Sequence, residues 1–179
     1  MSTMPPDAAA VLDRLNVSRE SRQRLETYVA LLLSWQKRIN LIGPATADAV
    51  WERHLLDSLQ LLPLLPRGTK VIAELGSGAG LPGLVVAIAG GLEAHLYESN
   101  GKKAAFLREA ARQTATRAHV HCVRLETLKA DRNLPRVDCV VARALAPLPL
   151  LLDYAEPFLS RGAIGLFHKG QDVDAELTE

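Results

Sequence analysis

Hydrophobic positions follow a helical period over the first third of the chain. Between residues 18 and 39, apolar side chains recur about every three or four positions and most charged side chains lie between them; the apolar positions are Leu25, Tyr28, Val29, Leu32, Trp35 and Ile39. Ser18 is a suitable N-cap for this helix, and Gly43-Pro44 ends it. A second helix is predicted from about Asp48 to the turn at Pro66-Arg67-Gly68. Residues 1–68 are therefore expected to form a helical cap.

From Lys70 onward, short apolar runs alternate with helical stretches. The runs predict strands at Val71–Leu75, Glu93–Glu98, His119–Val123, Asp138–Ala142 and Ala163–His168. Helices are predicted at Pro82–Ile88, Gly101–Thr114 and Leu148–Phe158, with a short or irregular link around Glu126–Asn133. This alternation indicates parallel βαβ units with helices on both faces of the sheet. We expect an α/β fold in which residues 69–179 form a Rossmann-like, doubly wound, mostly parallel sheet, packed with the cap into one compact unit.

Composition narrows the class of protein. The 179 residues are 48% hydrophobic and 23% charged, which is typical of a soluble globular domain. A net charge of +1 gives no general signal for nucleic acid. The N-terminus lacks the features of a signal peptide, and no apolar run approaches the roughly 20 residues of a membrane span. Cys122 and Cys139 fall in predicted strands and match no metal or redox spacing, so we expect buried thiols, no metal and no membrane, in a reducing cytoplasm.

The stretch VIAELGSGAGLPG places four glycines within eight positions directly after the first predicted strand. Ligands of open α/β sheets bind beyond the carboxyl ends of the strands, and glycine lets the backbone approach them closely. A register from Gly78 fits the dinucleotide pattern G-x-G-x-x-G, but it puts a proline where the phosphate-binding helix should have begun. A register of Gly76, Gly78 and Gly80, preceded by Glu74, is typical of the cofactor loop of S-adenosylmethionine-dependent methyltransferases.

Glu98 closes the second predicted strand, 22 residues after Gly76. A carboxylate at this point can accept hydrogen bonds from two ribose hydroxyls. Each signal also has a purely structural explanation. Together they favour a cofactor that contains a nucleoside, and they fit both registers.

Five motifs resemble those of the small-subunit ribosomal RNA methyltransferase G family, also called glucose-inhibited division protein B. They occur in the family's order and spacing and span about Leu25 to Leu177: INLIGPATADAVWERHLLDSL, ELGSGAGLPG, LYESNGKKAAFLREA, VVARALAPL and FHKGQ. The resemblance implies a class I methyltransferase fold and S-adenosylmethionine as the cofactor. It also implies methylation of N7 of one guanine in 16S rRNA of the small (30S) ribosomal subunit.

The resemblance also implies a set of cofactor-binding residues. Gly76 and Leu81 match positions of the loop, Glu98 matches the acid that binds ribose, and Arg143 matches an arginine of an SRA motif, here written ARA. Leu125 and Glu126 match the pair that borders adenine. With the rest of the loop, the expected cofactor-binding set is Glu74, Gly76, Gly78, Gly80, Leu81, Glu98, Leu125, Glu126 and Arg143. These residues follow or end successive predicted strands, so the fold should gather them at one rim of the sheet.

The chemistry of N7 methylation requires no catalytic acid or base. Guanine N7 carries an in-plane lone pair at neutral pH, so the enzyme has to hold the methyl group in line with it. The chain has no Asp/Asn-Pro-Pro-aromatic motif for amine methylation, and both cysteines lie inside predicted strands. Arg143 is expected to orient substrate or cofactor; the structural alternative is an ion pair with Glu74 or Glu98.

Contacts to RNA are expected from Arg53, His54, Lys102, Lys103 and Lys169. Between Gly101 and Arg124 the sequence has six basic residues and one acid, Glu109, which can form a phosphate-binding patch or simply a solvated helix face. His54 and Asp57 are three positions apart on a predicted helix and can also stabilise that helix.

Two other functions fit the sequence: a dinucleotide-dependent oxidoreductase, and a non-catalytic ribosome-docking module that keeps the cofactor pocket. The chain is expected to be a monomer. Its last residues, DVDAELTE, resemble the start of a helix, so the C-terminal strands implied by the resemblance are expected to be missing.

Overall fold

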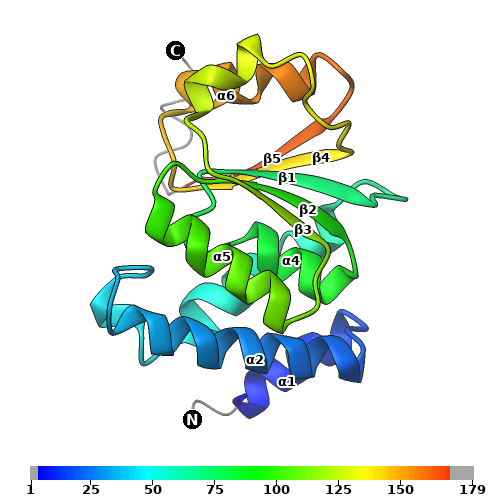
Figure 1. The fold of residues 1–179 in the computed structure, drawn as a ribbon. Coiled ribbons are helices and arrows are strands. Elements are labelled where there is room, and N and C mark those ends of the chain that lie inside the picture. Colours follow the sequence, from blue (N-terminus) through cyan, green and yellow to red (C-terminus); the bar gives the residue numbers. More distant parts are fainter. Residues whose placement is uncertain (1–3, 170–179) are drawn as a thin grey trace.

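Five parallel strands form one sheet in the computed structural model, which describes residues 4–169. The strands are β1 (Val71–Leu75), β2 (Glu93–Tyr97), β3 (Ala118–His121), β4 (Cys139–Arg143) and β5 (Ile164–His168), in the order β3-β2-β1-β4-β5 (Figure 1). All four neighbouring pairs are parallel. The chain builds outward from β1 in both directions, so the order reverses between β1 and β4. The predicted doubly wound parallel sheet is therefore confirmed over the described residues.

Helices cover both faces of the sheet, as predicted (Figure 1). On one face lie α4 (Gly83–Gly90) and α5 (Gly101–Gln113); on the other lie α6 (Leu148–Leu159) and a short 3-10 helix, η4 (Leu125–Ala130). Helix α4 is apolar throughout, with the sequence GLVVAIAG, because it lies between the sheet and the N-terminal helices. Each face has its own hydrophobic cluster.

The N-terminal helices α1 (Pro6–Arg14) and α2 (Arg19–Gln36) form a further layer outside α4 and α5 (Figure 1). Ser18 caps α2 by accepting a hydrogen bond from Ser21 N–H at 3.1 Å, as expected. The buried Tyr28 hydroxyl donates to the Ala79 carbonyl at 2.7 Å, which ties this layer to the glycine loop. The two segments share one hydrophobic cluster, and a domain boundary near residue 68 stays a prediction.

The sequence predicts one helix from about Asp48 to Pro66, but the structure has separate helical turns there, so the predicted continuous helix is wrong. The segment forms a π-helical turn, η2 (Trp51–Leu56), then one α-helical turn, α3 (Asp57–Leu59), and a separate 3-10 turn, η3 (Leu62–Leu64). Pro63 cannot continue an α-helix because it has no N–H and its ring clashes with the preceding turn. A short 3-10 turn, η1 (Pro44–Thr46), precedes this segment.

The third strand ends earlier than predicted, at His121. Cys122 is therefore exposed, so the expectation of a buried thiol is wrong there. Cys139 is buried as expected, and burial raises the pKa of its thiol to about 11. Apolar letters continue to Val123, but pairing with β2 stops because the chain turns away toward η4.

No helix in the described part of the chain combines the length and the apolar character needed to cross a bilayer. The helix start expected in the last residues falls on residues 170–179, which lie outside the described residues, so the expected loss of C-terminal strands stays a prediction.

Candidate functional site

A cavity of about 410 Å³ opens at the carboxyl ends of β1, β2 and β3, beside the loop that follows β4. This volume is within the usual range for a small-molecule site. Its lining includes the following residues: Gly76, Gly78, Tyr97, Glu98, Ser99, Lys103, Val123, Arg124, Leu125, Glu126, Leu145, Ala146, Leu150 and Tyr154. Five of the nine predicted cofactor residues lie on this wall, together with Lys103 from the predicted RNA-binding set.

The glycine loop forms the floor of the cavity. Gly76 has a φ of +67°, which favours glycine, and a Cβ placed there would lie 2.5 Å from Leu145 Cδ1, so the Leu145 side chain would have to move. Gly78 also has a positive φ, +55°, but a Cβ there would meet nothing closer than 3.9 Å. The loop is held to β2 by Ser77 N–H, which donates to Tyr97 O at 2.9 Å.

Glu98 lies at the end of β2, where the sequence predicts a ribose-binding acid. Its Oε2 accepts from Gly78 N–H at 2.8 Å, and its Oε1 accepts from Asn100 N–H at 2.8 Å. The carboxylate therefore fixes the loop against the start of α5. Each carboxylate oxygen has a second lone pair, so Glu98 can still accept hydrogen bonds from the cavity.

Glu74 does not line the cavity. It is 1% exposed beneath the loop, where its Oε1 accepts from Gly83 N–H at 2.6 Å and its Oε2 has no hydrogen-bond partner among residues 4–169. Burial raises the pKa of this carboxyl to about 8, so the group is largely protonated at neutral pH. Gly80 and Leu81 also lie behind the cavity wall, with Leu81 7% exposed and packed in the core.

Another part of the cavity lining is partly apolar and comes from the segment after β3 and from α6. Val123 and Leu125 follow β3, and Leu150 and Tyr154 project from α6. The Tyr154 hydroxyl donates to Glu126 Oε1 at 3.3 Å. Leu125 and Glu126 were predicted to border adenine. The α6 residues were missed, because nothing in their helical pattern distinguishes a cavity wall from a core face.

Arg143 ends β4 and lies outside the cavity lining. Its Nη1 donates to Asp57 Oδ2 at 2.7 Å, and its Nη2 lies 3.2 Å from His54 Nδ1. The expected ion-pair alternatives, Glu74 and Glu98, are therefore wrong: the partner carboxylate comes from the N-terminal segment. Asp57 Oδ1 also lies 3.4 Å from Nε2 of His168, at the end of β5.

These contacts define the protonation of His54. A guanidinium can only donate, so His54 Nδ1 accepts from Arg143, and its Nε2 carries the hydrogen toward the Thr46 hydroxyl at 2.7 Å. The hydroxyl in turn donates to Gly43 O at 2.8 Å. Burial and the nearby Arg143 charge lower the pKa of His54, which keeps the ring neutral. His54 is thus a buried acceptor that orients Arg143, and it is only 8% exposed.

The loop after β4 carries backbone strain close to the cavity. Ala144 has a φ of +47°, which is uncommon for a residue with a Cβ. It stands between Arg143 and Leu145, so the strained conformation directs one side chain to Asp57 and the next to the cavity. Lys169 Nζ donates to Ala146 O at 2.9 Å and supports the same loop.

The predicted RNA-binding residues do not line one common pocket. Lys102 and Lys103 begin α5, where Asn100 caps the helix, and Lys103 reaches the cavity. Arg53 lies on η2 beside Asp57 in a second surface depression. Elsewhere in the basic segment, Arg112 pairs with Glu109 at 2.7 Å, which supports the solvated-face alternative for that part of α5.

Solved structures show the same fold. The C-terminal domain of precorrin-6Y C5,15-methyltransferase from Rhodobacter capsulatus has a TM-score of 0.52 and 16% identity, covering 69% of this chain and 66% of that one. A SAM-dependent methyltransferase from Agrobacterium tumefaciens has a TM-score of 0.52 and 15% identity, covering 77% of this chain and 50% of that one. At these identities the likeness concerns the class I methyltransferase fold alone.

Sequence relatives carry the family assignment. A family model described as GidB, rRNA small subunit methyltransferase G, matches residues 21–179. The ribosomal RNA small subunit methyltransferase G of Rhodospirillum rubrum is 56% identical over 176 residues, covering 98% of this chain and 85% of the relative. The protein of the same name from Bradyrhizobium sp. (strain BTAi1) is 52% identical over 177 residues, covering 97% and 79%. The chain therefore belongs to the rRNA small subunit methyltransferase G family of methyltransferases.

Proposed function

We propose that the protein transfers a methyl group from S-adenosylmethionine to N7 of one guanine in 16S rRNA of the small ribosomal subunit. The observation that carries this proposal is the cavity at the carboxyl ends of β1 to β3, in a chain of this family. A dinucleotide oxidoreductase is not supported, since the matching relatives are methyltransferases.

The cavity residues fit the parts of this cofactor. Glu98 offers acceptor oxygens to the two ribose hydroxyls. Val123, Leu125 and Leu150 give an apolar surface for adenine, with Glu126 at its edge. The methionine portion is left to the glycine loop, where Gly76 and Gly78 expose backbone and no side chain. Glu74, Gly80 and Leu81 support the loop from behind, so their role in binding is indirect.

The protein's contribution to catalysis is positioning. When bound, the cofactor would supply a methyl group on a sulfonium. Guanine N7 would form the new N–CH₃ bond with a lone pair that needs no deprotonation, while the S–CH₃ bond breaks and the electron pair leaves with the neutral thioether. Holding the two atoms in line at near-attack distance is worth several kcal/mol of barrier, on the order of 7 or more in favourable cases. We therefore assign no general base, and neither cysteine a nucleophilic role.

Arg143 is a positioning residue in this proposal. Its guanidinium is fixed by Asp57 and His54, so it meets the RNA without losing much side-chain freedom. Lys102 and Lys103 at the start of α5 and Arg53 on η2 supply positive charge to the RNA, and Lys169 holds the loop at Ala146. The proposed setting is a monomer that acts in the cytoplasm on 16S rRNA or on the 30S subunit.

The test is methyl transfer from labelled S-adenosylmethionine to 30S subunits that lack the native modification, followed by strand scission specific for N7-methylguanine. We expect one labelled guanine. Glu98→Gln keeps the shape of the side chain, but its NH₂ group faces a backbone N–H of Gly78 or Asn100, where two donors oppose each other. Affinity for the cofactor should therefore fall by at least about tenfold. Glu109→Gln, on the solvated face of α5, is the matched control and should behave as wild type.

Arg143→Ala separates cofactor from RNA. Transfer should fall strongly while calorimetry still shows cofactor binding, because Arg143 does not line the cavity. Cofactor binding without any transfer to subunits would support the ribosome-docking alternative instead. Label on a different base or a different guanine atom would refute the N7 assignment.

A further inference from the structure

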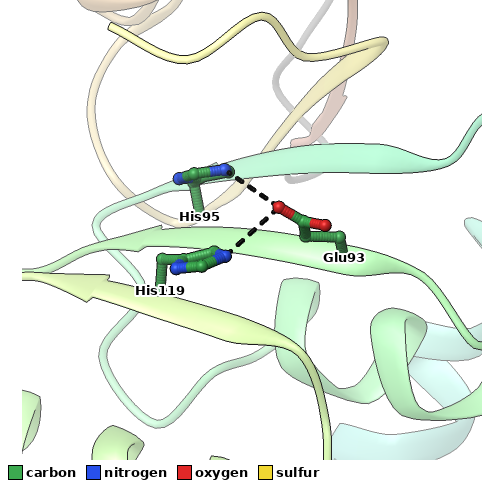
Figure 2. A group of neighbouring side chains, drawn as sticks. All are labelled: Glu93, His95 and His119. Atoms are coloured by element: carbon green, nitrogen blue, oxygen red, sulfur yellow. Dashed lines mark hydrogen bonds and ion pairs between the residues drawn. The ribbon is translucent and has the colours of Figure 1, made fainter. Parts of the chain in front are cut away.

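Three ligand-type side chains meet on β2 and β3, on the face of the sheet that carries α6 and away from α4 and α5. Glu93 and His95 are two residues apart on β2, so they point to the same face, and His119 is the direct register partner of His95 on β3. Figure 2 shows one oxygen of the Glu93 carboxylate facing a nitrogen of each imidazole ring. Glu93 Oε1 lies 3.2 Å from His119 Nε2 and 3.7 Å from His95 Nε2.

We propose that Glu93, His95 and His119 bind a divalent transition-metal ion of the Zn²⁺ type. One ligand atom from each residue lies within 4.8 Å of the other two. A tetrahedral ion at ~2.1 Å from its ligands separates them by ~3.4 Å, so small side-chain rotations bring the three atoms into place. Two imidazoles and one carboxylate are a usual donor set for zinc and leave a fourth position for water.

A fourth residue orients the central ligand. His95 Nδ1 lies 3.0 Å from His121 Nε2, so one of these two nitrogens carries the shared hydrogen. When His95 Nδ1 is the donor, the His95 Nε2 lone pair points toward Glu93 and His119, which is the form that binds a metal. Metal-bound histidines usually have such a partner on the other ring nitrogen. His121 is in turn stacked on Tyr97, with ring centroids 4.5 Å apart.

Aromatic stacking holds the imidazole rings of the cluster in place. The His95 ring stacks on the other two imidazoles, with its centroid 4.7 Å from that of His119 and 5.3 Å from that of His121. Arg117, 3.8 Å from Glu93 Oε2, occupies only the other carboxylate oxygen.

The position of the cluster suggests a structural ion. β3 is a four-residue edge strand, and the ligands join it to β2. Glu93 begins β2, whereas the cavity residue Glu98 follows the end of the same strand. The His119 side chain is 55% exposed, which leaves a path for the ion to enter. The site is thus separate from the proposed methyl-transfer site and does not depend on it.

The experiment is a calorimetric titration of the full chain, without a polyhistidine tag, with Zn²⁺, repeated with Co²⁺ and read by its absorption spectrum. We expect one ion per chain, with a Co²⁺ spectrum of nitrogen and oxygen ligands and no thiolate band. At a Zn²⁺ concentration about 100 times Kd, the melting temperature should rise by roughly 5–10 °C.

The variants identify the ligands. His119→Ala and Glu93→Gln should each weaken binding at least about tenfold and remove the rise in melting temperature, while circular dichroism confirms the fold. Cys122→Ser is the control, because Cys122 is an exposed thiol that could bind zinc by itself, and it should bind as wild type does. The proposal is overturned by the lack of a stoichiometric site, by unchanged binding in both ligand variants, or by loss of binding in Cys122→Ser.

Discussion

Glu74→Gln should remove a pH-dependent loss of stability from the protein. Glu74 is fully buried beneath the glycine loop, and burial raises the pKa of its carboxyl from the ordinary 4.5 to about 8. Between these two values the folded chain holds a proton that the unfolded chain has released. Raising the pH across this window therefore favours unfolding. Below about pH 4.5 both states are protonated and the effect is absent.

The magnitude follows from the two pKa values. Each unit of pH within the window costs up to about 1.4 kcal/mol, so wild type should lose about 4 kcal/mol between pH 5 and pH 9 through this one group. The Gln side chain cannot ionise. It can still accept from Gly83 N–H, but its NH₂ group takes the place of the partnerless Oε2, which costs about 1–3 kcal/mol at every pH. The pH slope, not the offset, is thus the informative quantity.

The assay is urea unfolding of wild type and Glu74→Gln at pH 5, 6, 7, 8 and 9. The difference in unfolding free energy should shift steadily in favour of the variant as the pH rises. Glu126→Gln is the control: the exposed Glu126 carboxyl has a pKa below its usual value because of its own backbone N–H and Arg124, so it is ionised throughout this range. Parallel stability curves for wild type and Glu74→Gln would refute the reasoning and mean that Glu74 is ionised in the folded chain.

Four further substitutions test the glycine loop, the Asp57–Arg143 ion pair and the loop after β4. Gly76→Ala should weaken cofactor binding at least about tenfold, because the added Cβ lies against Leu145. Gly78→Ala should cost only about 1–2 kcal/mol of stability from its positive φ, since a Cβ there has room. Calorimetry with S-adenosylmethionine and thermal melts compare the two variants, and equal losses of cofactor affinity would contradict the steric argument. Asp57→Asn should lower the stability of the fold by about 1–2 kcal/mol, because Arg143 loses its charged partner at a site only partly open to water. An unchanged melting temperature would show that this ion pair contributes nothing to stability. Ala144→Gly should leave stability unchanged or raise it by up to about 1 kcal/mol, because glycine adopts the left-handed conformation without strain. The same variant should slow methyl transfer if that conformation orients Arg143. Destabilisation would show that the backbone at residue 144 is not strained.

The periodic features of the chain were predictable from sequence. The strand β1 was placed at the residues observed, Val71–Leu75, and α5 and α6 were placed to within one residue. These elements are set by local patterns: buried runs for parallel strands, amphipathic spacing for helices, and glycines where φ is positive. The glycine loop and Glu98 were recognisable for the same reason, because their spacing along the chain is itself the signal.

Predictions from local patterns were wrong where an element's extent depends on its neighbours or on a local break. The apolar letters at Cys122 and Val123 look like strand, but a strand extends only as far as its neighbour pairs with it. The second N-terminal helix was predicted as continuous because amphipathic spacing does not report a π-turn or the break before Pro63.

Side-chain partnerships required the tertiary structure. Arg143 meets Asp57 from 86 residues away, and the sequence offered only Glu74 and Glu98 as partners. The absence of a metal site was expected from cysteine spacing, whereas the proposed ligands Glu93, His95 and His119 come together only through the register of two parallel strands. The physical reason is the same in each case. Local periodicity determines which face of an element a residue occupies, but the packing of distant elements determines what that face meets.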